Sequence, residues 1–294
     1  MSSSTSSLLK STPELRRRIW DGVVPIQIIL AASEARTLSD IPPYFANARR
    51  MSYFPLLFSE ITAYFKPYLR NPDTADSLEW WLEFEDVPLR WNWPIGLIYD
   101  LLTGLDPSQS DNPDHDWHLP WTLVLHFNKY PTETVLRLQS KNDLVEYWMN
   151  RIKEADFVRR GNATTVMNLS KADSTNLWTG VETHNYTMFW TVASKLLPHD
   201  PLSLRHIPIK IYLPSSNKVL HALVPPSLSL REPHTVGSAL HQYLPDLFPS
   251  RRACLIARPI LHGATLGMMI PLAELLYECM YTDGYLHICI VMIS

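Results

Sequence analysis

The sequence has few cysteines and glycines and no long apolar segment. Three cysteines, Cys254, Cys279 and Cys289, are too few and too widely spaced for a disulfide framework, and no CxxC pair offers a thiolate zinc site. With only nine glycines, the chain has no glycine-rich phosphate-binding loop. No apolar run approaches the ~18 residues that cross a bilayer. We therefore expect no membrane span.

Basic residues are not in excess, which excludes another class of protein. The formal net charge is -3, so we expect no nucleic-acid partner. Hydrophobic residues make up 46% and charged residues 19% of the 294 positions, as in globular proteins of two or three domains. The first eleven residues are rich in serine and threonine and have no apolar core. We expect a disordered tail there and no secretory signal.

Two groups of residues contain the side chains of a metal site or a cysteine nucleophile, but not the sequence context that such sites need. A polar loop gathers acids and histidines, namely Asp111, Asp114, His115, Asp116 and His118. Nothing rigid sets their spacing, so a hydrophilic insertion explains them better than a metal site. Cys254 or Cys279 could act as a nucleophile with His262 or His287. Both cysteines lie in apolar patterns, which favours core thiols. The residues alone therefore predict no catalytic group, cofactor or metal.

The first part of the chain predicts a small α+β domain. After a tail and a helix that begins at Pro13 (residues 1–20), the domain is expected over 21–131. Its expected strands are 24–30, a strand between 44 and 53, 78–84, 89–91 and 121–127, with a turn at 85–88. Its expected helices are 57–66 and 94–102.

Helical patterning then dominates over residues 132–200. Beyond the helix discussed below, helices are expected at 162–169 and 185–197, with Trp178 and Trp190 in the core.

The element order of the first domain returns over residues 201–294. Strands are expected at 207–213, 218–224, 254–257 and 286–293, and helices at 236–243 and 271–279. Both segments place a helix that begins after a proline directly before the last strand. This shared order predicts two copies of one ββαββ-type fold that flank a helical block.

A helix near the middle of the chain carries the lysine of greatest interest, Lys153. Ser140 is a candidate cap, and Gly161 a candidate stop. The apolar stripe of this helix consists of Leu144, Trp148, Ile152 and Ala155. Lys153 is nine residues beyond Leu144, which at about 100° per residue is roughly half a turn from the stripe. Its amine should face water, flanked by Glu154 and Asp156.

Several short motifs occur together, in one order, over about residues 15–293. They are the run Trp91-Asn92-Trp93-Pro94 through Leu102, Leu119-Pro120-Trp121 leading to His126-Phe127, Lys153-Glu154-Ala155-Asp156, Leu177-Trp178-x-Gly180, Phe189-Trp190 and Leu286-His287-Ile288. In this combination the chain resembles the autophagy protein 5 family. The resemblance implies two ubiquitin-like (β-grasp) domains that flank a helix-rich domain.

The resemblance also implies a function. Lys153 would accept the ubiquitin-like modifier autophagy protein 12 through an isopeptide bond, delivered by the conjugating enzymes of that pathway. An amphipathic helix of autophagy protein 16 would bind an interdomain groove, near which Trp91 and Trp93 are candidates, although a core role suits both better. The complex would act as an E3-like factor that promotes lipidation of autophagy protein 8. The chain itself would be non-catalytic, cytoplasmic, and peripheral at the membrane of the preautophagosomal structure.

Three further expectations qualify this assignment. The polar segment 103–119 is long for the family and has no assigned role. The chain ends Val291-Met292-Ile293-Ser294, without the glycine of a transferable modifier, so an acceptor is expected rather than a donor. The rival hypotheses are a multidomain ubiquitin-like adaptor that binds partner helices without being conjugated, and a cysteine hydrolase.

Overall fold

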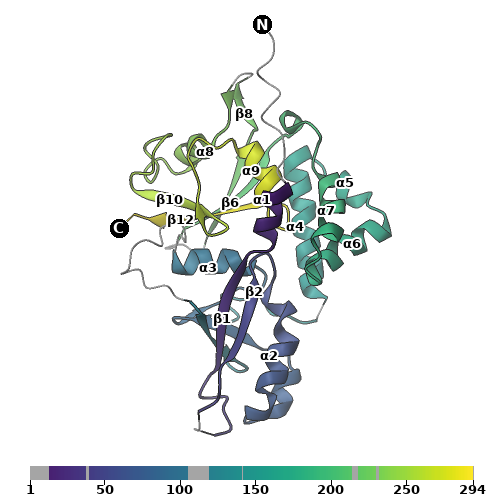
Figure 1. The fold of residues 1–294 in the computed structure, drawn as a ribbon, viewed down its shortest axis with the longest axis vertical. Helices are drawn as coiled ribbons and strands as arrows, with labels where there is room; N and C mark the ends of the chain where they lie inside the picture. Colours follow the sequence, from purple (N-terminus) through teal and green to yellow (C-terminus); the bar gives the residue numbers. More distant parts are fainter. Residues whose placement is uncertain are drawn as a thin grey trace. The chain divides into compact units, whose positions relative to one another are not determined.

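The structure is a computed structural model that describes residues 13–37, 40–104, 119–140, 142–213, 218–229 and 232–293 (Figure 1). The expected tail, the polar loop with its acids and histidines, and Lys141 lie outside these ranges. The described residues form two units. One comprises 22–99 and 119–149; the other comprises 13–21, 100–104 and the described residues from 150 onward. Helices α3 (Ile95–Thr103) and α4 (Asp143–Arg160) have residues in both units.

Among the described residues there are nine α-helices and twelve strands. The remaining α-helices are α1 Pro13–Trp20, α2 Phe58–Phe65, α5 Thr164–Met167, α6 Lys171–Glu182, α7 Tyr186–Ala193, α8 Val236–Tyr243 and α9 Leu272–Cys279. The strands are β1 Val23–Leu30, β2 Tyr44–Arg49, β3 Trp81–Phe84, β4 Val87–Pro88, β5 Trp121–His126, β6 Ile207–Tyr212, β7 Val219–Val224, β8 Ser227–Ser229, β9 Glu232–Pro233, β10 Ala257–Leu261, β11 Ala264–Thr265 and β12 Leu286–Met292. Short 3-10 helices occur at Phe54–Leu56, Lys66–Tyr68, Pro72–Asp76, Ser194–Leu196 and Pro201–Ser203.

The first sheet has the strand order β2-β1-β5-β3-β4. Its two central strands, β1 and β5, run parallel, and the other pairs are antiparallel. Trp121 of β5 is fully buried, with the rings of Phe54, Phe84 and Tyr99 packed around it at centroid distances of 6.1, 5.7 and 5.4 Å. Tyr99 belongs to α3, so this aromatic cluster fixes the last helix of the domain against its sheet.

The second sheet repeats the first. Its order is β11-β10-β12-β6-β7, again with a parallel central pair, β6 and β12. Each strand of the first sheet thus has a counterpart in the second, and the predicted duplication is confirmed. The short hairpin β8–β9, which the sequence analysis did not predict, is an addition to the second copy. Every residue of β6 is buried, so both faces of this strand are covered.

The helical block, which separates the two sheets along the chain, has helices that begin at side-chain caps. Ser170 accepts a hydrogen bond from the Asp173 N–H at 3.0 Å and begins α6, and Asn185 accepts one from the Met188 N–H at 3.0 Å and begins α7. A Cβ on Gly180 would lie 2.7 Å from the backbone nitrogen of Phe189, so only glycine permits this approach of α6 to α7.

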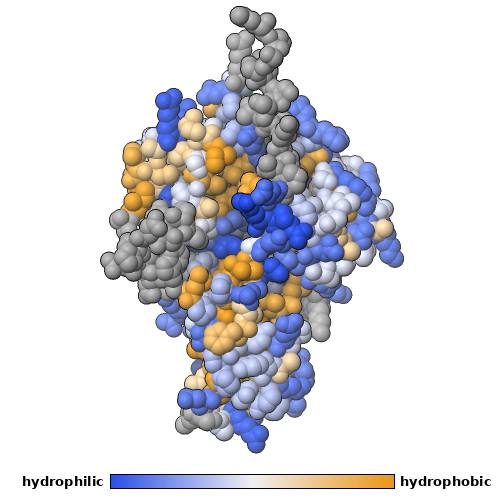
Figure 2. Space-filling model, in the orientation of Figure 1, coloured by the Kyte–Doolittle hydropathy of each residue, from blue (hydrophilic) through white to orange (hydrophobic). Residues whose placement is uncertain are grey.

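Helix α1 joins the helical block to the second sheet's helix α9. Trp20 is buried and stacks on the rings of His184 and Phe189, with centroids 4.8 and 5.1 Å away. Arg16 donates to the carbonyl of Tyr277 in α9 at 2.9 Å. The outer face of α1 carries its other arginines and forms a hydrophilic patch near the centre of Figure 2.

Four details of the sequence prediction are wrong. The expected strand 254–257 is instead β10, because the apolar run that suggested it is exposed at Leu255 and Ile256 and pairing begins at Ala257. Helix α6 was not predicted, because its apolar residues do not form a clear stripe at helical spacing. Its start is fixed by the Ser170 cap instead. Trp178 is only half-buried, whereas Trp190 lies in the core as expected. The first hairpin turns earlier than expected, at Glu85-Asp86.

That hairpin turn provides a stability test. Phe84 pairs with Val87, so the loop has two residues, and Glu85 and Asp86 have φ of 47° and 63°. Both φ values are positive, as a type I′ turn requires, and non-glycine residues are strained there. We expect the double change Glu85→Asn, Asp86→Gly to raise the free energy of unfolding by about 1 kcal/mol. Urea denaturation measures this, and Asp86→Val should lower stability. Equal midpoints for all three proteins would contradict this assignment of the turn.

Candidate functional site

Helix α4 presents Lys153 to solvent. The four residues of the predicted stripe, Leu144, Trp148, Ile152 and Ala155, are all buried. The exposed residues follow the same helical spacing on another face and comprise Glu146, Asn150, Lys153 and Phe157. The helix ends at Arg160, and Gly161 has a φ of 80°, as the predicted stop requires. The predicted exposure of Lys153 is therefore confirmed.

The Lys153 amine is not engaged by its neighbours. Among the residues that the structure describes, it makes no hydrogen bond or ion pair. The adjacent Glu154 is paired instead with Arg151 at 2.8 Å. By contrast, Lys66 and Lys195 each form an ion pair, at 3.0 Å, with Asp76 and Asp173. An amine that is exposed and not paired can approach a large reaction partner without first breaking an ion pair.

The sequence analysis placed Asp156 beside Lys153 in water, and this is wrong. The side chain of Asp156 is 0% exposed. One carboxylate oxygen accepts the Val166 N–H at 3.1 Å, and the other accepts from the Arg160 guanidinium at 3.2 Å. Burial is tolerated because both oxygens have donors. Asp156 thus connects α4 to the start of α5 and leaves Lys153 with one acidic neighbour rather than two.

Arg159 fixes the end of α4 against the second sheet's last turn. The residue is 1% exposed and donates to the Gly284 carbonyl at 3.1 Å, while its own carbonyl accepts the Arg205 N–H at 2.7 Å. Burial lowers the pKa of Arg159 to about 10, so it stays charged at neutral pH. Gly284 has a φ of 84°, and a Cβ there would lie 3.0 Å from an Arg159 nitrogen and 3.1 Å from the Ala155 Cβ.

A buried polar chain continues into the second sheet beside this contact. The Tyr212 hydroxyl lies 2.7 Å from Nδ1 of His287, whose Nε2 lies 2.9 Å from Asp283. Burial lowers the pKa of His287 and would by itself raise that of Asp283. The interaction with His287, which includes a hydrogen bond, the charge of Lys210 and the hydrogen bond from the Tyr285 N–H together outweigh burial and lower the Asp283 pKa. These three residues are packed inside the domain, where a substrate cannot reach them, so we interpret the chain as structural.

The cysteines lack the surroundings of a nucleophile. Burial raises the pKa of the Cys279 thiol to about 12, and His262 contacts the Cys279 carbonyl oxygen at 2.8 Å rather than its sulfur. Cys254 is half-buried, and burial raises its pKa as well. His287, the other predicted partner, is engaged by Tyr212 and Asp283. This geometry disfavours the cysteine hydrolase hypothesis.

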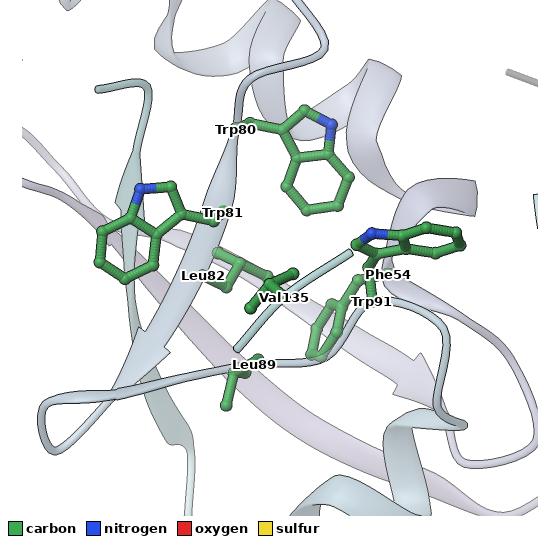
Figure 3. A pocket seen from close by; sticks show the side chains of 7 residues that line it. All are labelled: Phe54, Trp80, Trp81, Leu82, Leu89, Trp91 and Val135. Atoms are coloured by element: carbon green, nitrogen blue, oxygen red, sulfur yellow. The ribbon is translucent and has the colours of Figure 1, made fainter. Parts of the chain in front are cut away.

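The tryptophans considered for a partner groove pack in the first domain. Trp91 lines a small apolar crevice with Trp80 and Val135, too narrow for a water molecule (Figure 3). Its indole donates to the Leu136 carbonyl at 2.6 Å, and its ring contacts Tyr147 at the start of α4, with centroids 6.1 Å apart. Trp91 therefore has the core role that the sequence favoured. Trp93 is half-buried beneath the guanidinium of Arg90, 4.6 Å from the ring centroid.

Two negative findings concern the described ranges alone. Within them, no three histidine, cysteine, aspartate or glutamate side chains gather as metal ligands would. No helix among these residues has the length and apolar content to cross a bilayer.

Arg159 and Gly284 are the buried contacts of the Lys153 helix that sequence reasoning missed. A charged residue in a helix is ordinarily expected in water, so periodicity alone gave no signal for Arg159. The Thr282-Asp283-Gly284 sequence does indicate a turn with a positive φ, but not what packs against it.

Asp156 and Glu154 form a matched pair for testing the corrected arrangement. We expect Asp156→Ala to lower the free energy of unfolding by about 2–4 kcal/mol, because it leaves a buried N–H and Arg160 without their acceptor. Replacing the half-buried Glu154, whose ion-pair partner is Arg151, by alanine should change the free energy of unfolding by no more than about 0.5 kcal/mol. Chemical denaturation of both variants measures this, and equal losses would show that Asp156 is not the buried connection described above.

His287 should make stability depend on pH. Its pKa in the folded chain lies below the ordinary value of about 6.5. Below that pH the unfolded chain binds a proton that the folded chain does not, so stability falls as pH falls, by at most about 1.4 kcal/mol per unit. Asp283 remains ionised over this range, because its pKa is lowered from 3.8. The stability that its ionised form contributes is therefore lost only below about pH 3.8. The free energy of unfolding, measured by chemical denaturation at several values between about pH 7 and 5, should change less with pH in His287→Gln than in the unaltered chain. An equal pH dependence in the two proteins would contradict this role of His287.

Comparison with known proteins gives one consistent result. Family models described as the UblA domain, the alpha-helical bundle region and the UblB domain of autophagy protein ATG5 match residues 19–127, 141–199 and 206–290. Autophagy protein 5 of Phaeosphaeria nodorum is 39% identical over 306 residues, covering 96% of this chain and 98% of that protein. Autophagy protein 5 of Aspergillus fumigatus is 38% identical over 325 residues, covering 99% of each.

A solved structure has the same fold. The crystal structure of Kluyveromyces marxianus Atg5 superposes with a TM-score of 0.76 and 20% sequence identity, covering 95% of this chain and 99% of that one. The order ubiquitin-like, helical, ubiquitin-like agrees with the two sheets and the helical block described above.

Proposed function

Because the chain belongs to the autophagy protein 5 family, we propose that Lys153 is the acceptor of the ubiquitin-like modifier autophagy protein 12. One observation carries this proposal: Lys153 lies on the exposed face of α4, in the segment matched by the helical-bundle model, with its amine engaged by no described residue. The Lys-Glu-Ala-Asp motif that the sequence analysis matched to the family's acceptor contains this lysine.

The chemistry is the formation of an isopeptide bond. The lysine amine loses a proton, attacks the carbonyl carbon of the modifier's C-terminal glycine, and displaces the thiolate of a conjugating enzyme. This chain supplies the nucleophile and its position, and the conjugating enzyme supplies the thioester. The arrangement suits this division, because Asp156 holds α4 to α5 and Arg159 holds α4 to the Gly284 turn. A firmly held helix presents the amine in one place.

The wider role proposed is that of a non-catalytic scaffold. An amphipathic helix of autophagy protein 16 would bind a groove between domains, and the complex would act as an E3-like factor that promotes lipidation of autophagy protein 8 during autophagosome assembly. The chain would then work in the cytoplasm, peripherally at the membrane of the preautophagosomal structure. Family membership supports this role, and the raised pKa of Cys279 is consistent with a chain that contributes no catalytic thiol.

The division into domains at 21–131, 132–200 and 201–294, after a tail and helix at 1–20, remains part of this proposal. The rival is an adaptor of the same fold that binds partner helices and is never conjugated.

Reconstituted conjugation distinguishes the two. The full chain is incubated with autophagy protein 12, its activating and conjugating enzymes and ATP, and the products are separated on a denaturing gel. We expect a covalent adduct that Lys153→Arg abolishes, because arginine keeps the charge but is not a nucleophile. Lys171→Arg, an exposed lysine at the start of α6, is the matched control and should leave the adduct unchanged.

Three other results would count against the proposal. An adduct that survives Lys153→Arg and is lost in Lys171→Arg would move the acceptor to α6, and one that survives both would move it to another lysine, such as Lys141. Absence of any adduct with the unaltered chain, under conditions in which the conjugating enzyme is charged with modifier, would favour the adaptor.

A further inference from the structure

Phe157 is an exposed aromatic side chain on the helix that carries Lys153. It is 58% exposed, and among the residues that the structure describes no aromatic ring or cation packs against it. The other aromatic residues of α4 are covered, since Trp148 is buried and Tyr147 is half-buried. The packing of α4 within the chain thus uses the rings of Trp148 and Tyr147 and leaves more than half of Phe157 in water.

Phe157 lies one helical turn beyond Lys153. Four residues advance the helix by about 6 Å and leave the two side chains only about 40° apart around its axis. Side chains of a helix lean toward its start, so the ring of Phe157 leans toward Lys153. The exposed residue one turn before Lys153 is Asn150, which is polar. A protein that covers Lys153 therefore meets a polar group toward the start of α4 and an apolar ring toward its end.

The proposed reaction determines which protein covers this face. The lysine nitrogen must come within about 3–3.5 Å of the thioester carbonyl carbon to attack it. The sulfur of the conjugating enzyme is bonded to that carbon, so it lies within roughly 5 Å of the amine. A stable interface covers about 800 Å² of each partner. An enzyme surface centred on that sulfur therefore extends over Phe157, whose place on α4 is only about 6 Å from that of Lys153.

The folded body of the modifier is not held to the same place. It reaches the amine only through the residues that end at its C-terminal glycine, and an extended chain spans up to about 3.5 Å per residue. Four such residues allow the body to lie more than about 10 Å from the bond that forms. The conjugating enzyme is therefore the partner whose position the reaction fixes over this face.

We propose that Phe157 is a recognition residue for the conjugating enzyme, with its ring seated against an apolar side chain beside the enzyme's catalytic cysteine. This inference rests on the proposed role of Lys153 as the acceptor. Aromatic side chains near the centre of an interface carry a large share of the binding energy. The ring thus contributes to capture of the enzyme, whereas Lys153 performs the chemical step.

Three variants of the full chain separate recognition from chemistry. Phe157→Ala removes the ring and keeps a residue of high helix propensity, and Phe157→Leu keeps an apolar side chain. Met292→Ala is the matched control, because Met292 is also large, apolar and 48% exposed. It lies at the end of β12, a strand about 20 Å long, that is far from the Gly284 turn contacted by α4. Circular dichroism and chemical denaturation check that each variant is folded.

The kinetics of transfer test the role of the ring. Initial rates of conjugate formation are measured at increasing concentrations of the chain, with a fixed amount of conjugating enzyme charged with autophagy protein 12. We expect Phe157→Ala to raise the half-saturating concentration about tenfold and to leave the maximal rate unchanged, because capture is weakened and the amine is unaltered. The half-saturating concentration should rise less than about threefold for Phe157→Leu and less than about twofold for Met292→Ala.

Binding of the uncharged enzyme shows which protein the ring contacts. The conjugating enzyme without modifier is titrated into each fluorescently labelled chain. Phe157→Ala should weaken this binding about tenfold, whereas Lys153→Arg should leave it unchanged and abolish conjugation. Equal affinities of the Phe157→Ala chain and the unaltered chain for the uncharged enzyme would overturn the inference and assign the ring to the modifier.

Failure of this inference differs from failure of the proposed function. A lower maximal rate for Phe157→Ala at an unchanged half-saturating concentration would show that the ring orients the lysine instead of binding the enzyme. That result would overturn the inference and leave Lys153 as the acceptor. Conjugation that survives Lys153→Arg would overturn the proposed function, and this inference with it.

Discussion

The buried contact between Arg159 and the Gly284 turn is the constraint on which the position of α4 depends. A guanidinium removed from water is costly unless its charge is paired and its N–H groups find acceptors. One Arg159 N–H donates to the Gly284 carbonyl, and the nearby Asp156 carboxylate acts on its charge, whereas its buried Nε has no acceptor among the described residues. Its backbone carbonyl accepts the Arg205 N–H. The turn can receive it only because residue 284 is glycine with a positive φ. This side chain thus holds the C-terminal half of the lysine-bearing helix against the Gly284 turn.

The charged and polar groups near that contact differ in how far they are exposed to solvent. Next to Arg159 lies the buried Asp283–His287–Tyr212 chain, and the Lys210 amine lies 3.9 Å from the centroid of the Tyr285 ring. Farther out, Arg151 and Glu154 pair with partial exposure, and beyond them Lys153 stands in solvent with no described partner. The same helix therefore carries fully buried, half-buried and free charges within three turns. Its buried charges hold it in place, and its free charge is available for chemistry.

The sequence allowed accurate prediction wherever one periodicity decided the outcome. The exposure of Lys153 follows from the 100° step of a helix, and the duplicated sheet follows from the order of short apolar runs. Prediction failed where a long-range partner decided. From its position in the helix, Asp156 is expected at the surface, but it is buried and accepts the Val166 N–H. Arg159 is likewise expected in water, but it is buried and donates to the Gly284 carbonyl. Likewise, α6 begins at the Ser170 cap, a start that the helix propensities of the neighbouring residues do not indicate.

The doubly covered strand β6 has a consequence for how this architecture can change. A sheet with one face in water can be exchanged between proteins as an independent domain, because no neighbouring element has to cover that face. Here Lys210 of β6 lies within electrostatic reach of Arg151 and Glu154 of α4, and no residue of that strand is left exposed. Replacing α4 or exchanging the second copy without this helix would therefore expose strand surface that is buried here, so the two segments constrain each other's sequence.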